Sequence, residues 1–355
     1  MMEDEASAYL HLQEIAEYGT DAHRGNLLGI QPFMVPLDYA SEERFYAKID
    51  GILDVAFRRG WFNEKTIVVL PEYIGTWLVA AREKPRVYQA ESINNAMQTL
   101  VLSNLLSFVL ALVKVLPFAK AKDVVKYSLF RMKAARMAEI YHRVFSGLAK
   151  KHAVTIVAGS IVLPSPEVSN GKLAIGDGEL YNVSVVYRPD GSAYENVVRK
   201  VFPTEAELPF TAQASAIELP VFDTLAGRLG VLICADSWYP STYEAMKAKK
   251  ADLVAVPSYL GPDGIWETVW RGYDGAPAPD DVDVRDVKRI AEGEAWLKYA
   301  LAGRMAGAGI AHGINVFLRG DLWDLGSDGH TIVVKGRTVI EAKHVAGAAI
   351  INSWL

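Results

Sequence analysis

The chain has 355 residues and is 51% hydrophobic, which suffices for one large core or two smaller ones. Aromatic residues make up 10% and charged residues 22%, and this excludes a disordered or low-complexity protein. The formal net charge of -5 gives no reason to expect nucleic acid as a partner. A single cysteine, Cys234, fits a reducing compartment, and the acidic start is unlike a secretory signal, so the expected location is cytoplasmic.

Apolar strands and amphipathic helices are predicted to alternate along the chain. The first unit is a strand over 26–35, a helix over 41–60 and a strand over 65–73, an order that predicts a parallel pair of strands. Further helices are expected over 136–152, 241–251 and 294–309. Further strands and hairpins are expected over 154–163, 180–202, 228–236, 252–260, 314–320, 330–342 and 346–355.

Many of these strands are apolar throughout, which is typical of strands buried on both faces. We therefore predict an α/β fold of four layers, an α-β-β-α sandwich with two packed sheets and helices outside. No internal repeat or long linker interrupts the sequence, so a single domain over 1–355 is expected. The stretch 261–287 is rich in Gly, Pro and Asp and predicts a long functional loop.

A helical, partly hydrophobic insertion over 82–133 also stands outside the alternation. Between Ala81 and Lys151 there are thirteen Lys and Arg against four Asp and Glu, a net charge of +9. The apolar run 96–118 is close to the ~20 residues of a membrane span. Polar residues interrupt it, however, and a span would place the two halves of the sheet on opposite sides of the bilayer.

Three interpretations of the insertion stay open. It is a helical pair packed on the body or in a dimer interface, or a peripheral contact with an anionic membrane through residues 95–130, or a hydrophobic lid over the substrate. The second and third are compatible, and together they favour a lipid-like or long-chain amide substrate.

Three reactive side chains are placed at the ends of predicted strands. Glu72 directly follows Pro71, Lys200 ends an apolar strand, and Cys234 precedes a polar turn. Strand ends on one side of an α/β sheet converge on one crevice, where these residues would supply a base, a cation and a nucleophile. The structural alternatives are a solvated loop acid, a lysine lying along apolar surface and a core cysteine.

These residues stand in the segments "VVLPEY", "RKVFPTEAE" and "GVLICADSWYP", which in this order resemble the three signatures of the nitrilase superfamily of carbon-nitrogen hydrolases. The resemblance extends to "LYNVSVVYRPDG", "ADLVAVPSY" and "LGSDGHTIVVKGRTVI", and it covers most of the chain outside the insertion. It implies a Glu-Lys-Cys triad without metal or cofactor, and a homodimer or larger assembly. The sequence itself contains no histidine pair with metal-ligand spacing and no phosphate-binding glycine loop.

The roles follow from matching positions. The resemblance implies that Glu72 is the general base, Lys200 the oxyanion stabiliser and Cys234 the nucleophile. Glu207 falls where the family keeps a second glutamate that positions substrate or water, and Glu205 is close enough in sequence to compete for that place.

Residues after the cysteine are expected to shape the pocket. Asp236 matches the family's acid and is expected to cap the turn, and its N–H with that of Ala235 can face a substrate oxygen. Ala235 stands where the family often has an aromatic residue, which leaves the pocket wall and the substrate open. Five aromatic residues either line the pocket or belong to the core: Trp77, Trp238, Tyr239, Trp266 and Trp270.

The expected activity is hydrolysis of a non-peptide carbon-nitrogen bond, amide to acid plus ammonia or amine, through a thioester. The substrate is a small-molecule or lipid-like amide or nitrile. Open alternatives are a nitrilase, an N-carbamoyl hydrolase, an acyltransferase with the same triad, a Cys–His mechanism, and a non-catalytic membrane or interaction module.

Overall fold

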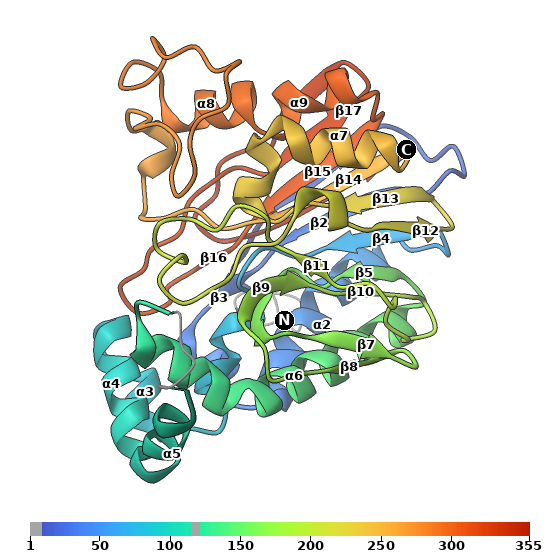
Figure 1. The fold of residues 1–355 in the computed structure, drawn as a ribbon. Coiled ribbons are helices and arrows are strands. Elements are labelled where there is room, and N and C mark those ends of the chain that lie inside the picture. Colours follow the sequence, from blue (N-terminus) through green and yellow to red (C-terminus); the bar gives the residue numbers. More distant parts are fainter. Residues whose placement is uncertain (1–8, 116–120) are drawn as a thin grey trace.

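The computed structural model describes residues 9–115 and 121–355 and contains two six-stranded sheets (Figure 1). The strands of the first sheet, in spatial order, are β1 (Leu12–Tyr18), β19 (Ala348–Trp354), β2 (Asn26–Gln31), β4 (Thr66–Val69), β5 (Thr155–Val157) and β10 (Val186–Tyr187). Those of the second are β12 (Val221–Thr224), β13 (Gly227–Val231), β14 (Leu253–Ser258), β15 (His312–Phe317), β17 (Ile332–Lys335) and β18 (Thr338–Glu341).

Three smaller sheets and a set of helices complete the fold. The smaller sheets pair β11 (Val198–Arg199), β9 (Leu180–Ser184) and β6 (Ile161–Pro164); β16 (Arg319–Gly320) and β3 (Phe33–Met34); and β7 (Glu167–Ser169) and β8 (Lys172–Ala174). The α-helices are α2 (Glu42–Arg58), α3 (Pro85–Tyr88), α4 (Ile93–Ser103), α5 (Leu105–Val115), α6 (Val124–His152), α7 (Pro240–Ala248), α8 (Glu292–Tyr299) and α9 (Leu301–Ala308).

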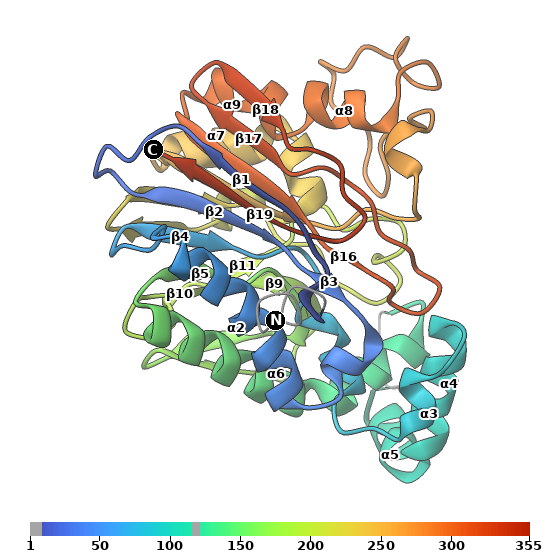
Figure 2. The ribbon, with the colours of Figure 1, turned by 180° about the vertical axis from the view of Figure 1, so that it is seen from behind.

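The two large sheets pack face to face, with α2 and α6 outside the first and α7, α8 and α9 outside the second (Figures 1 and 2). Alternate residues of β2 face opposite layers: Leu27 belongs to the core shared with the second sheet, and Leu28 to the core under α2 and α6. Gly29 permits close packing of the sheets, because a Cβ there would lie 2.7 Å from Ile314 and Val316 of β15. The predicted four-layer α-β-β-α fold is confirmed.

The first predicted unit forms as expected. Ser41 caps α2 by accepting a hydrogen bond from the N–H of Arg44, and β2 and β4 pair in parallel on either side of that helix. Strand β1 was not expected, because its residues are only half-buried at the edge of the sheet, where the apolar pattern is weak.

Several predicted elements are divided in the structure. The strands expected over 26–35 and 314–320 each form two strands in different sheets, β2 with β3 and β15 with β16. The strand expected over 154–163 is two strands in different sheets, β5 and β6, because Gly159 turns the chain with φ +65°. The helix expected over 294–309 is α8 and α9, broken at Ala300, whose ψ is -146°. The long apolar helix is α4 and α5, bent by 91° after Ser103, and its end over 116–118 lies outside the described residues.

The bend has a local cause in Asn104. Its side-chain amide donates to the Leu100 carbonyl at 2.9 Å and to Glu83 at 3.0 Å, so it competes with the helical backbone bonds. Among the described residues no single helix is both long and apolar enough to cross a bilayer, whereas α4 and α5 taken together meet that criterion as a bent pair.

Candidate active site

Glu72, Lys200 and Cys234 lie at neighbouring strand ends, after β4, β11 and β13 respectively. The N–H of Glu72 donates to the Ser258 carbonyl at 3.2 Å, which ties the end of β4 to β14 of the other sheet. The N–H of Lys200 donates to the Asn182 carbonyl at 2.9 Å and so extends the β11–β9 pairing. The structure therefore brings together three residues that are far apart in sequence.

Lys200 forms ion pairs with two carboxylates. Its Nζ lies 2.7 Å from Oε1 of Glu72 and 2.6 Å from Oε2 of Glu207, and all three side chains are at most 2% exposed. Asn182 joins the same two carboxylates, because its Nδ2 donates to Glu72 at 2.9 Å and to Glu207 at 2.8 Å. Two buried acids thus share one ammonium and one amide donor, which satisfies buried charges that would otherwise be costly.

The electrostatics of this cluster set the protonation states. Burial opposes the charge of Lys200, but Glu207 and Glu72 together raise its pKa well above the ordinary value. Burial raises the pKa of Glu72, although Lys200 opposes this effect. Burial also acts to raise the pKa of Glu207, but the charge of Lys200 and the hydrogen bond from the N–H of Thr204 outweigh burial, so the pKa of Glu207 is lowered. Glu207 therefore holds the lysine charge, while Glu72 is the carboxylate that takes a proton more readily.

Glu207, rather than Glu205, lies against Lys200. Glu207 also accepts from the N–H of Thr204 at 2.9 Å, whereas Glu205 is exposed and its own N–H donates to Asp274 at 3.0 Å.

Cys234 begins the short 3-10 helix η4 (Cys234–Trp238) with a φ of +50°, a left-handed conformation that is uncommon outside glycine. The sharp turn leaves the side chain on the wall of a pocket. The thiol donates to the Tyr259 carbonyl at 3.6 Å. Burial and then the charge of Glu72 raise its pKa well above the ordinary value, so the resting form is the thiol and a base must remove its proton.

Asp236 lies beneath the pocket wall and joins two strand ends. Its Oδ1 accepts from the N–H groups of Val201 and Phe202, and its Oδ2 accepts from the N–H of Ile233. The N–H of Asp236 itself donates to the Ile233 carbonyl, which leaves the N–H of Ala235 as the candidate of the two for contact with a substrate oxygen. Asp236 thus fixes the turn that carries Cys234 to the segment that follows Lys200.

A pocket of about 150 Å³ opens beside Cys234. Ala235, Trp238 and Tyr239 line it as expected, and Trp270 and Tyr273 reach it from the predicted loop over 261–287. Trp77 and Trp266 do not line it and pack elsewhere, Trp77 against Trp323 and Trp266 against His330. Among the described residues the lining includes no histidine, which weighs against a Cys–His mechanism.

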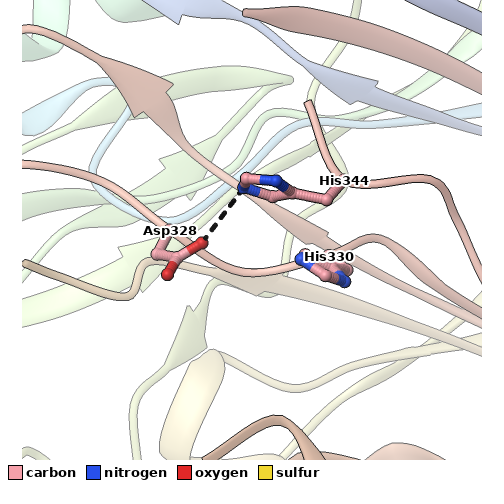
Figure 3. Close-up of side chains that lie close together, drawn as sticks. All are labelled: Asp328, His330 and His344. Atoms are coloured by element: carbon pink, nitrogen blue, oxygen red, sulfur yellow. Dashed lines mark ion pairs between the residues drawn. The ribbon is translucent and has the colours of Figure 1, made fainter. Parts of the chain in front are cut away.

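Asp328, His330 and His344 form a second polar cluster, which does not line the pocket (Figure 3). Their ligand atoms lie within 4.8 Å of one another. Asp328 is already engaged, however, because Oδ1 accepts from Arg319 and Gly329 and Oδ2 from Trp266. The guanidinium of Arg319 beside Asp328 disfavours a bound cation at this cluster. The N–H of Asp328 donates to the carbonyl of Leu260, a pocket residue, so the cluster supports the pocket wall at that point.

Sequence reasoning missed Asn182, Tyr259 and Glu292 as members of the site. Asn182 stands between Tyr181 and Val183 in a mostly buried strand, and that pattern was a usable signal, because a buried amide needs partners. Tyr259 and Glu292 come from segments whose placement depends on tertiary packing, and the sequence carries no comparable sign of them.

The carbon-nitrogen hydrolase family model matches residues 125–272. This range includes Lys200, Glu207 and Cys234. This match supports membership of the nitrilase superfamily. Glu72 lies outside the matched range, but the fold places it against Lys200 at the same strand ends.

Curated members of the superfamily match only part of the chain. Over 130 residues it is 25% identical to a probable hydrolase of Bacillus subtilis, which covers 37% of this chain and 23% of the relative. Over 118 residues it is 31% identical to Nitrilase 2 of Arabidopsis thaliana, which covers 29% of this chain and 34% of that protein.

Solved structures match nearly the whole fold. The structure is similar to an amidase from Nesterenkonia sp., with a TM-score of 0.57, 15% identity and coverage of 93% of this chain and 90% of the other. A butyramide complex of a mutant of that amidase is similar at a TM-score of 0.57 and 15% identity, with coverage of 94% and 93%. At this identity the likeness concerns the fold alone.

Proposed function

We propose that this protein is an amidase that hydrolyses a non-peptide carbon-nitrogen bond through a thioester on Cys234. The observation that carries the proposal is the arrangement of Glu72, Lys200 and Glu207 beside a cysteine held at a left-handed turn on a pocket wall. The match to the carbon-nitrogen hydrolase family supports it. So does a structural neighbour, the Nesterenkonia amidase, described with the acetamide moiety of fluoroacetamide added covalently at its active-site cysteine.

The first half-reaction forms the acyl-enzyme. Glu72 takes the thiol proton, and the sulfur of Cys234 forms a bond to the carbonyl carbon. Lys200 Nζ and the N–H of Ala235 stabilise the negative oxygen of the tetrahedral intermediate. The carbon-nitrogen bond then breaks as Glu72 returns the proton to the leaving nitrogen, so ammonia or an amine departs.

The second half-reaction releases the acid. Glu72 takes a proton from water, the hydroxyl oxygen bonds to the thioester carbon, and the carbon-sulfur bond breaks. The proton on Glu72 returns to the thiolate of Cys234. Glu207 keeps its charge throughout and holds Lys200 in place, consistent with its lowered pKa.

Nitriles are the second substrate class to test, because a curated relative at 31% identity over 118 residues is a plant nitrilase. The same thiolate would attack the nitrile carbon to give a thioimidate, and water would then release ammonia and the acid.

The test is intact-mass spectrometry of the protein with aliphatic amides and nitriles, alongside a measurement of ammonia release. We expect a covalent adduct of acyl mass on wild-type protein that is absent from the Cys234→Ala variant, together with ammonia release. Glu72→Gln should retain fold and lose ammonia release. Equal ammonia release by the wild type and Cys234→Ala would overturn the proposal.

A further inference from the structure

The pocket beside Cys234 is walled by aromatic rings that face one another. The rings of Trp238 and Trp296 lie 4.9 Å apart at 74°, those of Trp238 and Tyr273 5.5 Å apart at 81°, and those of Trp270 and Tyr273 5.8 Å apart at 67°. All four residues line the pocket. The rings of Trp238 and Trp270 also stack, at 5.9 Å and 21°. The rings are thus in contact with one another, and an ammonium group would be attracted to the ring faces that line the pocket rather than enter between the rings.

Acidic residues close the same pocket. Glu292, the first residue of α8, and Asp274, at the exposed rim, are the charged side chains in the lining. Neither lysine nor arginine contributes to the wall within the described parts of the chain. Asp274 is partly engaged, since one oxygen accepts from the N–H of Glu205. Glu292 has no cationic partner among the described residues.

The environment of Glu292 disfavours an isolated negative charge. Burial raises its pKa to about 7, and the neighbouring Trp296 indole offsets this only in part. The indole Nε1 of Trp296 is itself buried without a hydrogen bond of normal geometry. A positive group beside Glu292 would favour the charged carboxylate at neutral pH.

We propose that this pocket selects amides that carry a positively charged ammonium group a few bonds from the reacting carbonyl, with the cation between the aromatic rings and Glu292. This inference rests on the proposed function, because it takes Cys234 as the point where the carbonyl lies. A volume of about 150 Å³ suits a substrate with a short aliphatic chain.

The test uses two probes that share one shape. Trimethylammonioacetamide is cationic, and 3,3-dimethylbutanamide is its neutral counterpart, in which carbon replaces nitrogen. Binding to the Cys234→Ala protein, measured by titration calorimetry, separates recognition from turnover. We expect the cationic amide to bind roughly tenfold more tightly, as for a cation in a desolvated aromatic site beside a carboxylate. Equal binding, tighter binding of the neutral amide, or binding of neither would overturn the proposal.

A variant assigns the preference to Glu292. Glu292→Gln, made in the Cys234→Ala background, should bring the ratio of the two affinities close to one, and Glu267→Gln, an exposed acid on the neighbouring segment, should leave the ratio unchanged. An unchanged ratio in Glu292→Gln would remove that residue from recognition. The proposed function fails separately, if the wild type forms no acyl-enzyme with any amide.

A second inference concerns the lobe formed by α3, α4 and α5, which projects from one corner of the molecule (Figures 1 and 2). Helix α5 carries five exposed apolar side chains at helical spacing, and a sixth lies near the end of α4, just before the bend. We call these the apolar stripe: Leu102, Leu105, Leu106, Val109, Leu110 and Val113. Leu106 is 84% and Leu102 is 72% exposed, whereas Phe108, on the opposite side, is buried in the core. Contiguous apolar surface of this kind marks an interaction site.

Positive charge surrounds the apolar stripe. Arg82, Lys84 and Arg86 are exposed on and before α3, which packs against α4, and Lys122 is exposed before α6, which packs against α5. These exposed cations would repel the same surface of a second copy. Anionic lipid complements both the charge and the apolar side chains.

We propose that the apolar stripe is a peripheral contact for anionic bilayers. The test is co-sedimentation of the full chain with vesicles of phosphatidylcholine alone or with about a third phosphatidylglycerol, at low and high salt. We expect binding to the anionic vesicles that weakens with salt. The variant Leu106→Ser/Leu110→Ser should reduce the partition coefficient by roughly tenfold or more, because two large apolar side chains no longer enter the bilayer.

The matched control replaces two equally exposed apolar residues away from the lobe. Ile217 is 78% and Val284 is 79% exposed, and Ile217→Ser/Val284→Ser should partition as the wild type does. Equal partitioning of the stripe variant and the wild type would overturn the proposal. So would a stripe variant that changes the mass of the protein in solution instead, measured by light scattering, since a second copy would then cover the stripe.

Discussion

Asn182 donates a hydrogen bond from its amide nitrogen to Oε1 of Glu72 at 2.9 Å, inside a buried cluster. The same nitrogen donates to Glu207 at 2.8 Å, and the amide oxygen has no hydrogen-bond partner in the part of the chain that the structure describes. Asn182 therefore acts as a donor only, and it holds the two carboxylates in a fixed relation to Lys200.

The first prediction follows from that donor role. Asn182→Asp would place a third carboxylate against Glu72 and Glu207, and we expect kcat/KM to fall by about a hundredfold or more, since a removed or reversed buried charge contact costs several kcal/mol. Asn182→Ala removes the donor without adding charge and should cost less. Kinetics on both variants, with circular dichroism to confirm folding, checks this order, and equal losses would contradict it.

The second prediction concerns the acid limb of activity. Burial raises the pKa of Glu72 above its ordinary value of 4.5, and the base is active only when deprotonated. Activity should therefore rise with pH through a midpoint above 4.5. The measurement is kcat/KM against pH under conditions where the protein stays folded. A midpoint at or below 4.5 would contradict the assignment of Glu72 as base.

The third prediction concerns stability in acid. Lys200 and the N–H of Thr204 overcome the effect of burial and lower the pKa of Glu207, so its ionised form contributes stability above the pKa of an unfolded glutamate. That contribution should be lost as pH falls through the folded pKa. The difference in Tm between wild type and Glu207→Gln should be largest near neutral pH and shrink below about 4.5. A constant difference would contradict the prediction, and Glu205→Gln, at an exposed acid, is the control.

The reactive residues could be predicted because strand ends are local features. Glu72, Lys200 and Cys234 each follow an apolar run, and an α/β sheet brings such ends together. The left-handed φ of Cys234 was not foreseen, because nothing in its neighbouring residues demands that backbone conformation.

Pocket walls could not be predicted in the same way. Trp270 and Tyr273 come from a loop whose path is set by contacts with distant segments, such as the bond from the N–H of Trp270 to the Ile290 carbonyl. The break between α8 and α9 depends on Ala300, a strong helix former, so tertiary packing overrides the local preference there.

The fourth prediction tests Asp236 as a link between strand ends. Asp236→Asn keeps the shape but replaces one acceptor oxygen by an amide, so the N–H of either Ile233 or the Val201–Phe202 pair loses its partner. We expect a loss of about 1–3 kcal/mol in the free energy of unfolding. Urea titration of the variant measures it. Asp223→Asn, at an exposed aspartate of β12, serves as the control, and a similar small loss in both would contradict the prediction.

The fifth prediction concerns Gly159, which supports the segment that carries Glu72. Its φ is +65°, and a Cβ there would lie 2.1 Å from the carbonyl oxygen of Pro71, the residue before Glu72. Gly60 has a similar φ of +74° but no atom within 4 Å of an added Cβ. Gly60→Ala should therefore cost only about 1 kcal/mol for the left-handed backbone. Gly159→Ala should cost clearly more and also lower activity, because Pro71 must move and displace Glu72 from Lys200. The measurements are thermal unfolding and ammonia release for the Gly159→Ala and Gly60→Ala variants. Equal effects in both variants would show that backbone conformation alone explains the requirement for glycine.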